Sequence, residues 1–434
     1  MAFVPIYLGI LALTIVIDYF AGILLEQHEG RKKKWILALS IVANVGVLAV
    51  FKYYQFIFNN ISWLAHALDI PVQMPVLSIL LPIGLSFHTF QAMSYTIEVY
   101  RGHQKAERNF GIYCLYVMFY PQLVAGPIER PQNLLHQFRE EHSWDVERFR
   151  KGFSQMLWGF FKKVVIADRL SIFVNEVYGD WTHMSGANLW IAIVFFSFQI
   201  YCDFSGYSDM AIGLARMMGF RFPENFDSPY SSRSITEFWR RWHITLGAFM
   251  RDFLYIPLGG NRVGSKWRLY FNLWLVFLVS GLWHGASWNF VLWGAFHGFF
   301  LILDRLFLLK FLEKAGKVPA TLFTFFIVAM AWVLFRIESW QNAKIFYFQL
   351  IDIDDIKFIE LNNSFYLVLL LAILFSVLGR SGVFQRVSHF LTKENPSLSI
   401  SKSAILTLIT IVLFFLSVVF LSASNLNPFI YYRF

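Results

Sequence analysis

Charged residues are scarce in this sequence: Asp, Glu, Lys and Arg make up 15% of its 434 residues, while 57% are hydrophobic. In a soluble domain about one quarter of the residues are charged. A soluble protein with this composition would expose too much apolar surface to stay dispersed. The apolar residues also gather in blocks of about 20, the length that crosses a bilayer as a helix. The sequence therefore predicts a membrane protein that crosses the bilayer many times.

Cysteines and ligand-binding motifs are scarce as well. Cys114 and Cys202 stand far apart in apolar surroundings, so they predict neither a disulfide framework nor a metal site. The sequence contains no HExxH, no CxxC pair, no Walker loop and no GxGxxG. We therefore expect no metal ion, no bound cofactor and no nucleotide or dinucleotide chemistry.

The apolar blocks predict an all-α polytopic membrane protein with about ten transmembrane helices. The first block has no Lys or Arg before it and no small-residue cleavage site after it, so we expect a retained helix rather than a signal peptide. Residues 110–127 and 235–260 are apolar but interrupted, and we expect them to be re-entrant or interfacial. No repeat or soluble segment stands out, which predicts a single membrane domain over 1–434. The expected crossings lie near 3–26, 35–58, 76–100, 152–178, 187–215, 268–290, 291–309, 319–337, 363–380 and 403–422.

Basic residues gather in alternate connections between these crossings. Cytoplasmic loops carry the Lys/Arg excess, so we expect the basic connections inside the cell and both termini outside it. The net charge of +9 is then mainly an orientation signal, and we expect no nucleic-acid partner. A second use stays open, because cytoplasmic basic residues attract phosphorylated substrates such as an acyl-coenzyme A. The basic connections are 27–34, 101–109, 127–151, 216–267, 310–318 and 381–402; of the others, 59–75 and 179–186 lack Lys and Arg and 338–362 is acidic.

One histidine stands inside one of the most apolar stretches, SGLWHGASW at 280–288. Polar groups at such depth are costly and usually face the bundle interior or a pathway. A neutral imidazole is cheaper to bury than a carboxylate, and it exchanges a proton near neutral pH. His284 is therefore a candidate general base, with Trp283 beside it. The alternative is a core histidine that is hydrogen-bonded to a backbone carbonyl.

A second polar cluster lies in FWRRWHITLGAF at 238–249. Glu237 and Arg241 are four residues apart and are expected to pair on one helical face. Arg240 and His243 complete the cluster. The alternative is an interfacial amphipathic helix with basic residues toward phosphates and tryptophan at the headgroup level. That alternative explains the arginines better than it explains His243.

Two carboxylates, Asp203 and Asp209, stand in the apolar run SFQIYCDFSGYSDMAIG at 197–213. They either form an ion or proton relay or fix basic partners structurally, and we favour the structural role. The chain ends in an aromatic tail at 423–434 that contains NPFIYYRF. Termini usually fray, but this one is short and aromatic and contains a proline that stiffens it. One interpretation is an interfacial aromatic belt that holds the end of the last helix.

Five groups of residues occur in order over most of the chain: PIGLSFHTFQAMSY, FYPQLVAGPIERP, QIYCDFSGYSDMAIG, FWRRWHITL with RDFLYIPLGGNR, and SGLWHGASWNFVLWG. Together they resemble the membrane-bound O-acyltransferase superfamily, and specifically its bacterial alginate O-acetyltransferase branch. The resemblance implies a ring of many helices and re-entrant pieces around a central funnel. It also implies O-acetylation of an exported or cell-wall polysaccharide.

The resemblance also assigns roles to individual residues. The invariant histidine of the family matches His284, and a second family histidine matches His243. Related systems carry acyl groups from a cytoplasmic donor to an acceptor on the outer side. They use a C-terminal aromatic peptide ending like FIYxxF, whose tyrosine is proposed to carry the acyl group, and PFIYYRF places Tyr431 in that position.

From this resemblance we expect an acetyl-coenzyme A-dependent O-acetyltransferase in the bacterial inner membrane. His284 would be the base, since positioned bases near neutral pKa accelerate such steps by about 10²–10⁴-fold. Tyr431 would be the acyl-accepting nucleophile, and its phenol needs a neighbouring base because its usual pKa is near 10. His243 would orient the donor or assist proton transfer.

Four further residues are predicted to bind substrate: Arg240 and Arg241 at the phosphates of the donor, Trp283 and Asp203. The candidate donors to the oxyanion are Trp283 and backbone amides of the re-entrant segments. The expected partners are an extracytoplasmic SGNH or esterase-like acetyltransferase, a polysaccharide acceptor and membrane lipids. Two other functions compete with acyl transfer. A transporter or flippase for a polysaccharide precursor would use the intramembrane carboxylates and histidines as a proton relay. Internal repeats would support this function, but none stands out in the sequence. A scaffold would anchor an external enzyme without catalysis.

Overall fold

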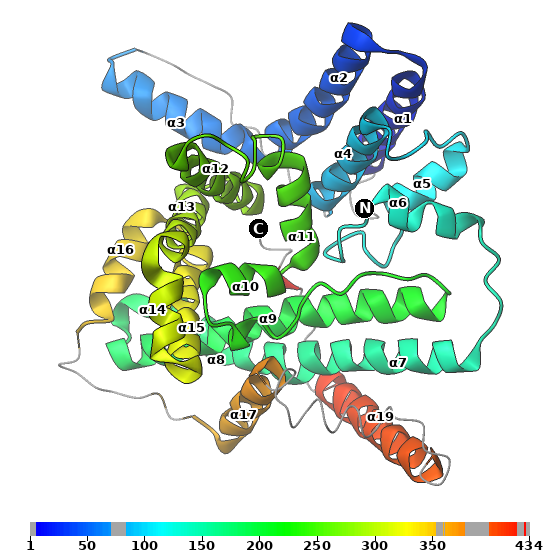
Figure 1. Ribbon diagram of the computed structural model, residues 1–434. Coiled ribbons are helices and arrows are strands. Elements are labelled where there is room, and N and C mark those ends of the chain that lie inside the picture. The colour runs from blue at the N-terminus through cyan, green and yellow to red at the C-terminus, as the bar shows by residue number, and fades with distance from the viewer. Residues whose placement is uncertain are drawn as a thin grey trace. The chain divides into compact units, whose positions relative to one another are not determined.

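The computed structural model describes residues 6–70, 84–352, 359, 361–377, 399–422 and 429–430. Within these ranges all regular secondary structure is helical (Figure 1), which confirms the predicted all-α class. Tyr431 and all of the tail except Phe429 and Ile430 lie outside the described residues.

The α-helices are α1 (Ile6–Gln27), α2 (Gly30–Leu48), α3 (Tyr54–Ala67), α4 (Leu85–Arg101), α5 (Phe110–Met118), α6 (Pro131–Leu134), α7 (Val146–Phe160), α8 (Asp168–Gly179), α9 (Gly186–Met217), α10 (Ile235–Arg241), α11 (Ile244–Met250), α12 (Lys266–His284), α13 (Trp288–Leu303), α14 (Leu309–Ala315), α15 (Lys317–Arg336), α16 (Trp340–Gln349), α17 (Asn363–Val377) and α19 (Ser399–Ser422). Wider π-helical turns, which often mark functional sites, connect some of them: η1 (Ala49–Tyr53), η3 (Phe161–Ala167), η6 (Arg251–Tyr255) and η7 (Asp304–Leu308). Short 3₁₀ turns are η2 (His136–Arg139), η4 (Trp181–His183) and η5 (Pro229–Ser231).

Several helices are long and apolar enough to cross a membrane, so the chain is a multi-pass membrane protein. Within the described ranges five qualify, and two shorter apolar helices, Asn363–Ser376 and Leu408–Ser422, accompany them. The total of ten crossings stays a prediction. The five long helices are Leu8–Gln27, Gly30–Ala67, Gly186–Met217, Trp288–Ala315 and Lys317–Arg336.

The boundary between two expected crossings, 268–290 and 291–309, lies earlier than predicted. Helix α12 ends at His284, and α13 begins at Trp288. Gly285, Ala286 and Ser287 connect the two helices. His284 therefore stands at a helix terminus and not within a continuous span.

The chain forms two compact units, each with its own packing. The first unit comprises 1–144, 219–222 and 283–287, and the second comprises 145–218, 223–282 and 288–434. The assignment of one membrane domain to the whole chain stays a prediction.

In the first unit, α1, α2 and α4 pack against one another. A polar cluster joins two of them: the buried carboxylate of Asp18 in α1 accepts hydrogen bonds from Ser40 at 2.6 Å and Asn44 at 2.8 Å, both in α2. Buried polar groups need such partners in an apolar environment. These hydrogen bonds fix the position of α1 along α2.

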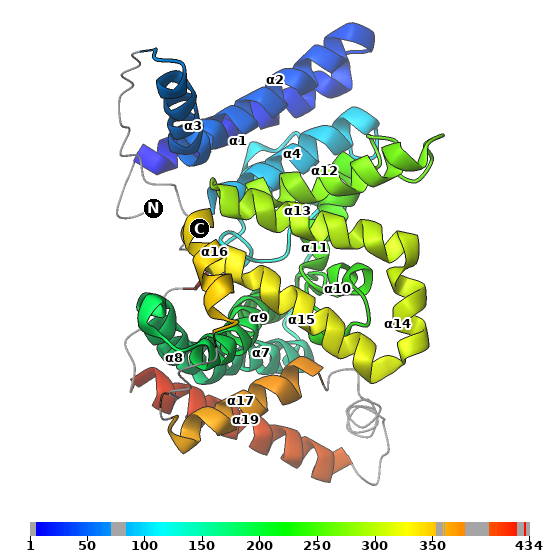
Figure 2. The ribbon, with the colours of Figure 1, turned by 90° about the vertical axis from the view of Figure 1, so that its left-hand side faces the viewer.

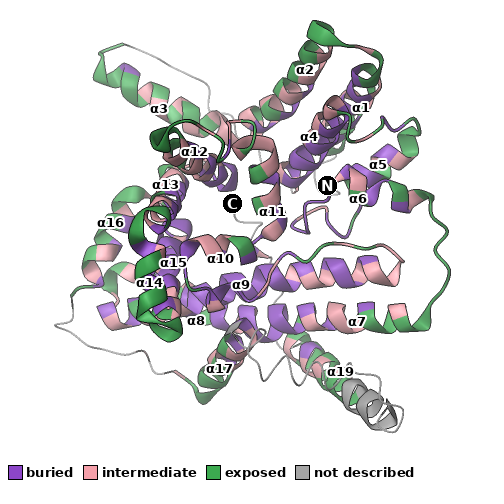
Figure 3. Ribbon diagram, viewed as in Figure 1, coloured by how far each residue is buried: buried purple, intermediate pink, exposed green. Residues whose placement is uncertain are grey.

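In the second unit, α9 is the central helix. It lies along α7, η3 and α8, and α17 and α19 pack on the same helices (Figures 1 and 2). Its apolar window is 83% buried, against 17% for Gly30–Ala67, and most of its ribbon is coloured as buried in Figure 3. Polar side chains on α9 are therefore interior groups that need partners.

Glycines bring α7 and α9 into close contact. A Cβ atom on Gly152 would lie 2.6 Å from the carbonyl oxygen of Gly213, and one on Gly206 would lie 2.8 Å from that of Gly159. Gly152 and Gly159 are seven residues apart in α7, and Gly206 and Gly213 are seven residues apart in α9, so the glycines of each helix lie on one face. Small residues allow the backbones of membrane helices to approach this closely. The close approach of α7 and α9 also determines which face of α9 lies against η3, the continuation of α7.

Candidate functional site

His284 is buried at the end of α12, within the first unit, with 7% of its surface exposed. Its neighbour Trp283 stacks on Phe90 of α4, with ring centroids 5.0 Å apart and planes 11° apart. Phe87, one turn earlier, meets the same indole edge-on at 5.5 Å. Aromatic side chains of α4 therefore hold the helix end that carries the predicted base.

Lys52 is a further residue at this position that the sequence reasoning missed. Its ammonium group, from η1, donates hydrogen bonds to the backbone carbonyl oxygens of Trp283 at 2.6 Å and His284 at 3.0 Å. The last carbonyls of a helix have no partner within the helix and attract cations. A lysine inside the expected crossing 35–58 is costly, and that cost was the signal that could have identified it.

His243 lies in the second unit, between α10 and α11, and is 1% exposed. Its backbone is left-handed, with φ of +47°, which is unusual for a residue with a side chain. The Nδ1 atom lies 3.2 Å from Oδ1 of Asn225, and the ring meets Phe204 edge-on. Such a backbone persists only where its surroundings determine it.

The contacts of Asn225 also define which nitrogen of His243 carries hydrogen. The backbone N–H of Thr245 donates to Oδ1 of Asn225 at 3.1 Å, so that atom is the amide oxygen. An oxygen accepts, and Nδ1 must therefore donate. In the neutral ring the lone pair then belongs to Nε2, which suits a group that orients a donor or takes a proton.

The two arginines of the cluster have different surroundings. Arg241 is buried, pairs with Glu237 as predicted, and donates to the hydroxyl of Ser231 at 2.6 Å. Arg240 is exposed. Its guanidinium is therefore the more accessible of the two for a phosphate group.

Both carboxylates of α9 bind lysine ammonium groups from η3. Asp203 accepts from Lys163 at 2.7 Å, and Asp209 accepts from Lys162 at 2.6 Å. Lys163 also pairs with Asp168 at 2.8 Å. Both carboxylates of α9 thus have buried cationic partners, and charges inside membrane proteins are usually paired in this way.

The described end of the C-terminal tail lies on the same cluster. The backbone N–H of Ile430 donates to Oδ2 of Asp203 at 2.9 Å, and Ile430 is 8% exposed. The ring of Phe429 lies 4.7 Å from Nζ of Lys163 and meets Tyr207 edge-on at 5.0 Å. Ile430 is therefore buried in the second unit and Phe429 is partly buried there, which an aromatic belt at the membrane surface does not explain.

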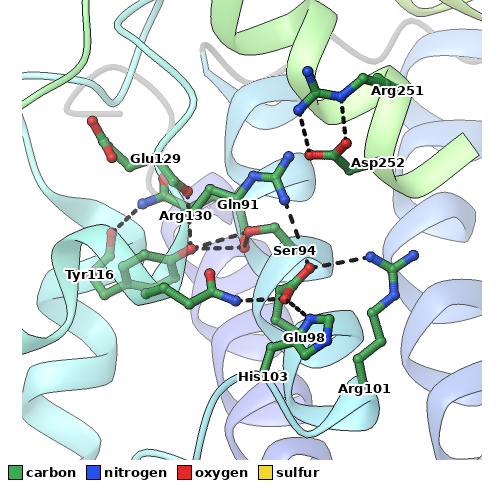
Figure 4. A network of polar contacts seen from close by, with 11 residues as sticks. Gln91, Ser94, Glu98, Arg101, His103, Tyr116, Glu129, Arg130, Arg251 and Asp252 are labelled. Carbon is green, nitrogen blue, oxygen red and sulfur yellow. Dashed lines mark hydrogen bonds and ion pairs between the residues drawn. The ribbon is translucent and has the colours of Figure 1, made fainter. Parts of the chain in front are cut away.

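Basic residues of the connections in the first unit also have internal partners. Figure 4 shows the buried carboxylate of Glu98, which binds His103 at 2.9 Å, Arg101 at 3.3 Å and Arg130 at 3.7 Å. Glu129 directly precedes Arg130 in the sequence, and burial raises the pKa of the Glu129 carboxyl to about 8. Part of the positive charge outside the crossings is therefore bound by Glu98.

Comparisons with known proteins identify the class. Residues 101–314 match the model of the membrane-bound O-acyltransferase family. The chain is 36% identical to the probable alginate O-acetylase AlgI of Azotobacter vinelandii, over 99% of this chain and 91% of that relative. It is 36% identical to the peptidoglycan O-acetyltransferase of Helicobacter pylori, over 78% of this chain and 68% of that relative. It is 27% identical to the teichoic acid D-alanyltransferase of Streptococcus thermophilus, over 70% of this chain and 82% of that relative.

The chain therefore belongs to the membrane-bound O-acyltransferase family, in its bacterial alginate O-acetyltransferase-like branch. It is an O-acyltransferase, as the resemblance implied, and family membership favours this function over the transporter, flippase and scaffold alternatives.

Proposed function

We propose that the chain passes an acetyl group from cytoplasmic acetyl-coenzyme A across the bacterial inner membrane, for O-acetylation of a polysaccharide outside the cytoplasm or in the cell wall. Both termini face outward in this arrangement. The proposal draws on the named activities of the relatives, which are alginate O-acetylation and peptidoglycan O-acetylation.

The first step in this proposal loads the tail. The phenol oxygen of Tyr431 attacks the thioester carbonyl carbon, while the imidazole of His284 takes the phenol proton. The carbon–sulfur bond breaks, and coenzyme A leaves as a thiol after it receives that proton. A relay through a covalent intermediate divides one long transfer into two shorter ones.

The second step empties the tail. A hydroxyl group, on an extracytoplasmic SGNH or esterase-like transferase or on the polysaccharide, attacks the acetyl-tyrosine carbonyl carbon. The bond between the tyrosine oxygen and the carbonyl carbon breaks, and the proton of the attacking hydroxyl returns to the phenol. His243 and the exposed Arg240 are assigned to orienting the donor, and Trp283 to the developing oxyanion.

One observation carries the proposal. Phe429 and Ile430, directly before Tyr431 in the sequence, are held on the buried Asp203–Lys163 pair of the central helix region. A tail that served only as an anchor at the membrane surface would not need a buried carboxylate to bind its backbone. Binding at this place supports a function for the residue that follows.

The test uses the purified full-length chain in lipid nanodiscs with acetyl-coenzyme A labelled in the acetyl group. We expect the label on the C-terminal peptide, and its release when an acceptor is added. Coenzyme A release without label on that peptide, at any time after mixing, would exclude the tyrosine intermediate and favour direct transfer to the acceptor.

A further inference from the structure

The contacts around Phe429 and Ile430 define a binding site in the second unit. We propose that Lys163, Asp203 and Tyr207 form a socket, here named the tail socket, which captures the chain's own C-terminal segment through Phe429 and the backbone N–H of Ile430. Seating in the socket positions Tyr431 for acylation, and this positioning role rests on the proposed function.

The socket depends on the π-helical form of η3. Lys162 and Lys163 are adjacent, yet both ammonium groups reach carboxylates on α9. A wide π turn changes the direction of successive side chains relative to an α-helix, and such turns occur frequently at functional sites. The close glycine contact between Gly159 and Gly206 brings this turn against α9.

The carboxylate of Asp203 binds both the lysine and the tail. Its Oδ1 accepts from Lys163 at 2.7 Å, and its Oδ2 accepts from the N–H of Ile430 at 2.9 Å. The side chain of Asp203 is 3% exposed, so both hydrogen bonds lie away from water. A charge-assisted hydrogen bond to a backbone N–H depends on the position of the backbone and not on the type of side chain.

The ring of Phe429 supplies recognition of a side chain. It lies over the ammonium group of Lys163 at 4.7 Å and packs edge-on against Tyr207, with planes at 86°. A cation beside an aromatic face is stabilised most when water is excluded, and the side chain of Lys163 is 7% exposed. Two adjacent tail residues therefore engage both members of one ion pair.

The test measures seating of the tail separately from activity. Carboxypeptidase trims the full-length protein in nanodiscs, and intact-mass measurement follows removal of the C-terminal residues. We expect Phe429→Ala to speed trimming past position 430 by about tenfold, since a buried cation–π contact and an apolar ring are lost. Phe429→Trp should restore protection because it keeps an aromatic face, and Phe415→Ala, at a phenylalanine that is 65% exposed on α19, should trim like the wild type.

Ile430→Pro tests the backbone contact, because proline lacks the N–H that Asp203 binds. The substituted position is the fifth from the C-terminal end, so the risk to folding is small. It should speed release of residues 432–434, which come off before the enzyme meets the proline, about as much as Phe429→Ala does, whereas Ile430→Val should not. Unchanged trimming in both Phe429→Ala and Ile430→Pro would overturn the socket.

Acetyl labelling distinguishes the two proposals. Loss of protection together with about tenfold less label on the tail supports the positioning role. Loss of protection with undiminished label overturns that role. A wild-type tail that is protected but never labelled overturns the proposed function and leaves the socket as a binding site for the terminus.

Discussion

The ammonium group of Lys52 donates a hydrogen bond to the backbone carbonyl oxygen of His284 at 3.0 Å, and a second to that of Trp283 at 2.6 Å. It binds the backbone of the predicted base. Lys52 therefore fixes where α12 ends, without using the hydrogen-bonding atoms of the imidazole. A cation at a helix C-terminus is favourable, and more so where it is partly buried.

Replacing Lys52 by methionine should lower kcat for acetyl transfer by about 10²-fold, because displacing a catalytic group by about 1 Å has effects of that size. The KM for acetyl-coenzyme A should change less, and Lys52→Arg should recover part of the rate because it keeps the cation. Initial rates of coenzyme A release from the purified chain measure both constants. Lys34→Met, at an exposed lysine of α2, is the matched control; a wild-type rate for Lys52→Met would refute the positioning role.

His284→Ala should abolish external O-acetylation while the protein still inserts in the membrane. Removing a general base lowers the rate by about 10²–10⁴-fold. Acetyl groups released from the polysaccharide of cells that express the variant measure the activity, and membrane fractions measure the protein. His136→Ala, at an exposed histidine, controls for loss of a histidine as such. Acetylation retained by His284→Ala would remove this residue from the mechanism.

The sequence predicted those features that depend on local pattern. Apolar blocks predicted the helical membrane class, and the four-residue spacing predicted the pair between Glu237 and Arg241, which the structure confirms. Both follow from the periodicity of one helix. Roles assigned from the family resemblance, such as that of His243, are not tested by the fold.

Contacts between distant segments were not predictable in this way. Asp203 and Ile430 are 227 residues apart, and no pattern near either residue identifies its partner. The lysines Lys52 and Lys163 carry a local signal, since charge in an apolar run is costly. That signal indicates that a partner exists, but only the packing of η1 and η3 determines which one.

His243→Asn should keep the fold and lose activity. Asparagine tolerates the left-handed backbone that His243 adopts, whereas most residues do not. It lacks an imidazole, so donor orientation or proton transfer should suffer, and we expect the rate to fall by about tenfold or more. Gel filtration of the purified variant reports folding, and coenzyme A release reports activity. A normal rate would assign His243 to packing alone.

Gly206→Ala should destabilise the contact between α7 and α9. The added Cβ would lie 2.8 Å from the carbonyl oxygen of Gly159, and this backbone atom cannot move aside easily. Overpacking of this kind costs about 1–3 kcal/mol, so the unfolding midpoint in detergent should fall. Gly46→Ala, in α2, adds a Cβ with no atom within 4 Å and should leave the midpoint unchanged or slightly higher. Equal midpoints for both variants would mean that the helices separate enough to admit a methyl group.

Tyr431→Phe removes one oxygen atom from the tail and keeps the aromatic ring. If that oxygen carries the acetyl group, the label on the C-terminal peptide should vanish and O-acetylation should stop, since no other atom of the side chain forms an ester. Tyr432→Phe makes the same change one residue later and should leave both readouts at wild-type levels. Mass spectrometry of the C-terminal peptide after incubation with labelled acetyl-coenzyme A separates the two variants. Undiminished O-acetylation in Tyr431→Phe would mean that the acceptor hydroxyl takes the acetyl group directly, and the tail socket would then hold the terminus for another purpose.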